Sequence, residues 1–76
     1  MGRLPLHEAD TLHPLVVVDI RDDKIRSQCL EFNLRQGQVI VVLSRIPHGP
    51  CVIQLQGRQI ALGEELCRRI TVSRRM

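Results

Sequence analysis

The chain has 76 residues, and 11 lysine and arginine side chains against 8 aspartate and glutamate side chains give a formal net charge of +3. Hydrophobic residues make up 43% and charged residues 25% of the chain, a composition typical of a folded domain rather than a disordered one. We expect one small domain over residues 1–76, because domains have roughly 100–200 residues. This length excludes a two-domain enzyme, a Rossmann unit and a TIM barrel.

The sequence carries no pattern of a membrane span or a secretion signal. Its longest apolar run is residues 39–43, whereas a membrane-spanning helix needs about 20 apolar residues. The first residues lack the apolar stretch of a signal peptide. Three cysteines, odd in number and widely spaced, favour buried reduced thiols over a disulfide framework or a zinc site: Cys29, Cys51 and Cys67. We therefore expect a cytoplasmic protein.

Aromatic residues are 1% of the chain, and Phe32 is the single one. Valine, isoleucine and leucine must therefore fill the core almost alone. Proteins that bind single-stranded nucleic acid stack bases on exposed aromatic side chains, and proteins that bind proline-rich peptides use aromatic grooves. Both of these binding modes are disfavoured here.

The first part of the chain predicts an anchored segment followed by a strand. Residues 1–14 are mixed in character, and three leucines are expected to anchor them on the body: Leu4, Leu6 and Leu12. The β-branched run 15–20 predicts a strand. Simple alternation would place Val16, Val18 and Ile20 on one face of it.

A short helix is predicted over residues 23–32. Asp22 or Asp23 is suited to cap its first turn, and four residues follow at helical spacing: Ile25, Gln28, Cys29 and Phe32. Asn33 comes next, and asparagine, after glycine, most readily adopts the left-handed conformation that ends a helix.

The second half of the chain predicts mainly strands. Residues 38–43 are apolar throughout, and the proline- and glycine-containing stretch 44–50 predicts a loop. Two further runs, 51–56 and 58–62, flank Gly57 and predict a β-hairpin with Gly57 at the tight turn. Alternation along the first of these runs puts its cysteine and its aliphatic residues toward the core.

One helical turn over 63–68, a short strand over 70–72 and a basic tail complete the predicted elements. About five short strands and one helix cannot cover both faces of an open sheet, whereas a barrel shares one core and protects its edges. We therefore predict a mainly β fold: a small, partly open, SH3-like β-barrel with one short α-helix after the first strand.

Two stretches, residues 29–41 and 47–72, together resemble the FeoA-like family, the ferrous iron transport protein A group. The family pattern is similar to a leucine-glycine-leucine-x-proline-glycine turn before a valine strand, then a glycine-proline loop, a G-x-x-I-A-L strand and a closing I-x-V. The resemblance covers about residues 15–73, with a basic tail at 74–76. This chain departs from the pattern at the helix end, where Asn33 replaces the glycine and Gln36 the proline.

The resemblance implies a cytoplasmic, non-enzymatic accessory protein of ferrous iron uptake. Its expected partner is the cytoplasmic GTPase domain of the ferrous iron permease, ferrous iron transport protein B, and this partner alone would bring it to the membrane. A similar domain closes some metal-dependent transcriptional repressors. The resemblance implies no firm cofactor and leaves open a transient divalent metal, ferrous iron.

The expected partner-binding surface combines the rim of the helix with the loop that follows the second predicted strand. Leu30 and Leu34 are expected to remain partly exposed there and to give a partner an apolar anchor. The full set of candidate contact residues is Leu30, Leu34, Arg35, Arg45, Pro47, His48 and Pro50. No arrangement of a nucleophile with a base, paired carboxylates or a phosphate-binding loop indicates catalysis.

Two alternatives to the accessory function remain open: metal sensing by the domain itself, and nucleic-acid binding. A regulatory domain that itself binds a divalent metal would draw on the weak candidate ligands His7, Glu8, His13, His48 and Cys51. The arginines near the C-terminus form either a solvated edge or a surface for an acidic partner or an anionic membrane: Arg68, Arg69, Arg74 and Arg75. Nucleic-acid binding by a basic small barrel is the third possibility.

Overall fold

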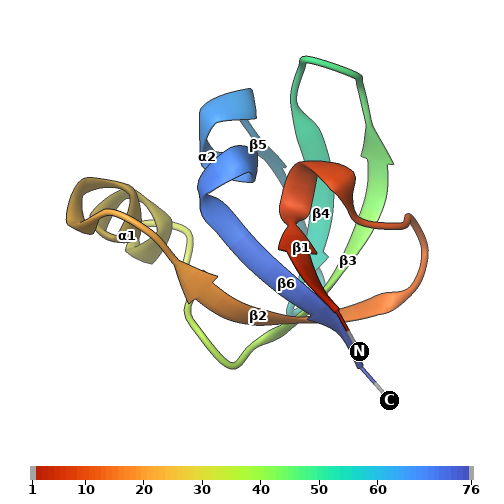
Figure 1. Cartoon of the computed structure of the whole chain (residues 1–76), viewed down its shortest axis with the longest axis horizontal. Helices are drawn as coiled ribbons and strands as arrows, with labels where there is room; N and C mark the ends of the chain where they lie inside the picture. The colour runs from red at the N-terminus through yellow and green to blue at the C-terminus, as the bar shows by residue number, and fades with distance from the viewer. Residues whose placement is uncertain (1, 76) are drawn as a thin grey trace.

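The computed structural model describes residues 2–75 and shows one twisted sheet with short helices packed at its ends (Figure 1). In chain order the elements are β1 (Arg3–Pro5), the 3-10 helix η1 (Leu6–Glu8), β2 (Pro14–Ile20), α1 (Asp23–Leu30), β3 (Val39–Arg45), β4 (Cys51–Leu55), β5 (Arg58–Leu62), α2 (Glu64–Arg69) and β6 (Ile70–Arg74).

The strands form one antiparallel sheet in the order β1-β6-β2-β3-β4-β5. The two outer strands, β1 and β5, are not hydrogen-bonded to each other, so the barrel is partly open, as predicted. The structure has a sixth strand that the sequence did not predict. This strand, β1, pairs with β6 through Leu4 opposite Val72.

The core is aliphatic and is built from alternate residues of the strands. In β4, Cys51, Ile53 and Leu55 are buried and Gln54 is exposed, which confirms the predicted alternation. In β2, Leu15 and Val17 are buried, then a register shift between Val17 and Asp19 restarts the pattern at Ile20. The expectation that Val16, Val18 and Ile20 share one face is therefore wrong, because a β-bulge changes which residues face the core.

The predicted caps of α1 are present. The side chain of Asp22 accepts a hydrogen bond from the backbone N–H of Lys24 at 2.9 Å. Asn33 has a φ of 64°, and its N–H donates to the carbonyl of Leu30 at 3.0 Å. The N–H of Leu34 donates to the carbonyl of Cys29 at 3.0 Å, which completes a Schellman motif. The helix itself ends at Leu30, so the predicted range 23–32 includes the turns that follow it.

The same motif overturns the expected exposure of Leu34. The Schellman turn folds the chain back onto the helix and packs the residue after the cap against the last turn. Leu34 is accordingly 0% exposed, in the core beside Cys29, whereas Leu30 is 52% exposed. Leu30 is thus the apolar side chain that the end of α1 presents to solvent.

The N-terminal segment is anchored by two of the three predicted leucines. Leu6 is fully buried and Leu4 is half-buried against the core. Leu12 is 68% exposed, so the prediction that it anchors the segment is wrong. It sits in a turn with a φ of 65°, and its N–H is held by the carbonyl of Val42 at 2.8 Å.

The hairpin and the C-terminal elements follow the prediction with longer strands. Gln56 and Gly57 have φ values of 52° and 79°, the pattern of a two-residue type I′ turn. Strand β3 extends to Arg45, into the predicted loop. Strand β6 extends to Arg74, because Leu15 pairs with Arg74, so the basic tail is shorter than predicted and Met76 lies outside the described residues.

We predict that two substitutions at Asn33 differ in their effect on stability. Asn33→Gly should keep the free energy of unfolding within about 0.5 kcal/mol, because glycine adopts a positive φ without strain. Asn33→Ala should lower it by about 1–2 kcal/mol, because Cβ disfavours this conformation. Urea denaturation of the two variants measures the difference. Equal midpoints would contradict the role given to the left-handed cap.

Candidate functional site

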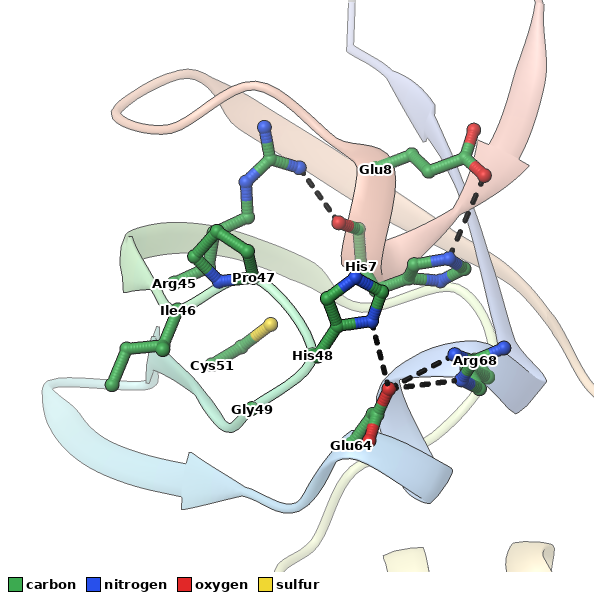
Figure 2. Close-up of a pocket in the computed structure, with 10 residues that line it drawn as sticks. All are labelled: His7, Glu8, Arg45, Ile46, Pro47, His48, Gly49, Cys51, Glu64 and Arg68. Carbon is green, nitrogen blue, oxygen red and sulfur yellow. Dashed lines mark hydrogen bonds and ion pairs between the residues drawn. The ribbon is translucent and has the colours of Figure 1, made fainter.

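A groove of about 510 Å³ opens between the β3–β4 loop, η1 and α2 (Figure 2). Side chains from three parts of the sequence meet in it, and Cys51 lies buried beneath them. We call it the loop groove, and its lining residues are His7, Glu8, Arg45, Ile46, Pro47, His48, Gly49, Cys51, Glu64 and Arg68.

The β3–β4 loop is a tight turn that presents His48. The N–H of Gly49 donates to the carbonyl of Ile46 at 2.8 Å, and Pro47 and His48 occupy the two positions between them. His48 has a φ of 60°, so the turn has the pattern of type II, in which proline commonly precedes a residue with positive φ. The His48 side chain is 87% exposed and points toward Glu64 (Figure 2).

Glu64 organises the charges on the α2 side of the loop groove. Its Oε2 accepts from Nη2 of Arg68 at 2.9 Å and lies 3.9 Å from Nδ1 of His48. On the opposite side, Arg45 donates to the carbonyl of His7 at 2.8 Å. The guanidinium groups of the groove are thus already engaged: Arg45 ties β3 to η1, and Arg68 pairs within α2.

Four of the five candidate metal ligands line the loop groove: His7, Glu8, His48 and Cys51. The fifth, His13, is exposed on the loop before β2. His7 Nε2 lies 3.5 Å from Glu8, and its Nδ1 is buried without a hydrogen-bond partner. Across residues 2–75, no three histidine, cysteine, aspartate or glutamate side chains are close enough together to hold a metal ion.

All three cysteines are buried, as predicted. Burial, together with a hydrogen bond and a charge interaction with the Cys51 thiol, raises the pKa of Cys67 to about 12. The Cys67 thiol also donates to the carbonyl of Leu62 at 3.6 Å. Burial raises the pKa of Cys29 as well. Since the thiolate is the reactive form, Cys29 and Cys67 are structural core residues at neutral pH.

A second, smaller groove of about 210 Å³ lies at the end of α1, and we call it the helix groove. Leu30 stands exposed at its edge above the buried Leu34. Arg26 is held by its hydrogen bonds to the carbonyl of Ile20 at 3.3 and 3.4 Å. The groove is lined by Ile20, Arg26, Leu30, Leu34, Arg35 and Gln36.

The predicted partner-binding residues fall into two places rather than one. Leu30, Leu34 and Arg35 line the helix groove. Arg45, Pro47 and His48 line the loop groove, and Pro50 is exposed beside it. In Figure 1 the β3–β4 loop and α1 lie on different sides of the molecule, so the structure does not join these residues into one face.

Sequence reasoning assigned Arg68 only to the basic C-terminal residues and gave Glu64 no role, so it missed that both side chains shape the loop groove. Their spacing of four residues is the signal that was available, because a glutamate followed four residues later by a basic residue forms an ion pair on a helix. Nothing in the sequence indicated that α2 packs beside η1 and faces the β3–β4 loop. Within residues 2–75, the structure has no helix of the length and apolarity that crossing a membrane requires.

The fold is that of a small SH3-like domain, and comparison with known proteins identifies its family. A family model described as the FeoA domain matches residues 4–74, and the chain belongs to this family. A solved structure described as iron uptake regulatory protein (FeoA) is 29% identical, covers 97% of this chain and 100% of its own, and superposes with a TM-score of 0.88. No curated protein matches the sequence.

Two further structures share the fold at lower identity. A FeoA-like protein from Clostridium acetobutylicum is 19% identical, with a TM-score of 0.84 over 100% of this chain and 91% of that one. A manganese-dependent transcriptional repressor is 16% identical, with a TM-score of 0.87 over 96% of this chain but 42% of its own. The same fold therefore occurs as a small protein and as one part of a larger repressor.

We predict that Cys67 makes the stability of the protein fall at high pH. The unfolded thiol ionises above a pKa of about 9, whereas the folded thiol has a pKa of about 12. The stabilisation is therefore complete below pH 9 and is lost as the pH rises toward 12, by on the order of 1–2 kcal/mol at about pH 10.5. Urea denaturation at several pH values should show a shallower decline for Cys67→Ala. An identical decline in both proteins would contradict this role of Cys67.

Proposed function

We propose that the protein is a small, non-enzymatic accessory protein of ferrous iron uptake that binds the cytoplasmic GTPase domain of the ferrous iron permease. Membership of the FeoA domain family supports this proposal. It is also supported by the likeness to the solved iron uptake regulatory protein, which extends over 97% of this chain and the whole of that one. We propose that the protein works in the cytoplasm.

The observation that carries the docking proposal is the exposed Leu30 beside the helix groove. Its side chain is 52% exposed, and the groove next to it has Leu34 as an apolar floor. Arg26 and Arg35 line the same groove, and the guanidinium of Arg26 already contacts the carbonyl of Ile20 and the carboxylate of Asp23. An apolar side chain of the partner can pack against Leu30 while a neighbouring carboxylate pairs with Arg35, so the groove offers an apolar contact with a charged residue at its rim.

A second candidate function is regulation through a divalent metal bound by the domain itself. Its support is that four candidate ligands line one groove: His7, Glu8, His48 and Cys51. The helix groove needs no metal to bind a protein, so the accessory function ranks first. Titration of the protein with ferrous iron alone, followed by amide NMR, distinguishes the two functions. A metal site would shift the amide resonances of residues that line the loop groove without any partner present.

We predict that Leu30→Ser weakens binding of the purified permease GTPase domain at least tenfold, because truncating a hot-spot side chain costs about 2 kcal/mol. Isothermal titration calorimetry with the intact chain measures the change. Leu30 is mostly solvent-exposed, so the variant should remain folded, which circular dichroism checks.

The matched control is Ile46→Ser, which removes a 60% exposed side chain from the edge of the loop groove. This control should change the affinity less than twofold. The reverse pattern, with Ile46→Ser weakening binding and Leu30→Ser not, would place the docking surface at the loop groove and contradict the helix groove. No binding by the unsubstituted chain would contradict the proposed function.

A further inference from the structure

The loop between η1 and β2 presents an aliphatic side chain to solvent on a strained backbone. Leu12 is 68% exposed, more than Leu30, Val39 or Ile46. Its φ of 65° is a conformation that leucine adopts at a cost of about 1–3 kcal/mol and that asparagine or glycine adopts readily. Neither folding nor packing accounts for a leucine here, since it contributes nothing to the core.

Three arginines lie on β1 and at the end of β6, because the sheet brings both ends of the chain beside the start of β2. Arg3 pairs near the end of β6, where it lies opposite Ser73. Arg74 lies opposite Leu15, and the N–H of Arg75 donates to the carbonyl of Pro14 at 3.2 Å. All three side chains are exposed, and we call Arg3, Arg74 and Arg75 the basic end.

The charges around the loop favour an anionic partner. Asp10 lies 4.0 Å from Arg74, so one of the three guanidinium groups of the basic end is paired with a carboxylate. The ion pair between Asp10 and Arg74 is weak, because solvent-exposed ion pairs contribute little free energy. The next residue after Leu12 is His13, which is exposed as well.

We propose that Leu12 and the basic end form a contact for an anionic lipid bilayer. Headgroup phosphates would pair with the guanidinium groups, and the Leu12 side chain would enter the apolar boundary beneath them. An anionic bilayer uses both features of this surface. The phosphate backbone of a nucleic acid would use only the arginines, and the surface offers no aromatic side chain for stacking on bases.

The position of this contact suits a protein that also binds a membrane-bound partner. In Figure 1 the loop between η1 and β2 and both chain ends lie on the right, while α1 lies at the far left. The bilayer contact and the helix groove are therefore at opposite ends of a molecule 28 Å long. One leucine and three arginines give weak, reversible binding, which leaves the protein free to dissociate.

Cosedimentation with vesicles tests the bilayer contact without any other protein. We expect the intact chain to bind vesicles of phosphatidylcholine with about 30 mol% phosphatidylglycerol at low salt, and to release at about 0.5 M salt. Vesicles of phosphatidylcholine alone should bind at least tenfold less. Leu12→Asn should weaken binding about tenfold, and Arg75→Gln about fivefold.

Two matched controls separate this surface from general surface properties. Ile46→Asn makes the same kind of change at another exposed aliphatic residue, and Arg21→Gln removes another exposed guanidinium. Each should change vesicle binding less than twofold. Leu12→Asn should unfold no more easily than the unsubstituted chain, because asparagine tolerates the left-handed conformation.

Three results would overturn the proposal. The first is no binding to anionic vesicles at low salt, and the second is equal binding by Leu12→Asn and the unsubstituted chain. The third is tighter binding to duplex DNA than to the vesicles, sensitive to Arg75→Gln but not to Leu12→Asn. That result would make the basic end a nucleic-acid surface. None of these outcomes depends on whether the permease GTPase domain binds.

Discussion

The fold depends on where strand β6 enters the sheet. This strand is the last in the sequence, yet it lies between β1 and β2 and pairs with both. Its pairing with β1 brings Arg3 beside the end of the chain, and α2, which leads into it, packs beside η1. The basic end and the loop groove both result from this one long-range pairing. Forming it costs conformational entropy, because it closes a loop that contains almost the whole chain.

The helix groove depends instead on a local device, the left-handed residue after α1. Asn33 ends the helix and turns Leu34 into the core, and this leaves Leu30 as the exposed apolar side chain. The groove beside Leu30 has Leu34 as its floor for the same reason. A surface that we propose for a partner is thus positioned by backbone hydrogen bonds of the core, so it is held in place before any partner arrives.

The sequence predicted what local chemistry determines. Asp22 and Asn33 indicated the two ends of the helix, and Gly57 indicated the hairpin turn. What it could not predict depended on contacts between distant residues. The bulge that resets β2 at Asp19 is set by pairing with β6, and β1 is too short to show a strand pattern of its own.

The candidate site was predictable in composition but not in arrangement. The sequence placed the candidate contact residues on one face, whereas the structure divides them between two grooves. We propose that the permease GTPase domain docks at the helix groove. The most direct test of this proposal is an amide NMR titration of the labelled chain with that domain. We expect shifts concentrated on Ile20, Arg26, Leu30 and residues 34–36, whereas shifts concentrated on residues 45–49, or none, would contradict docking at the helix groove.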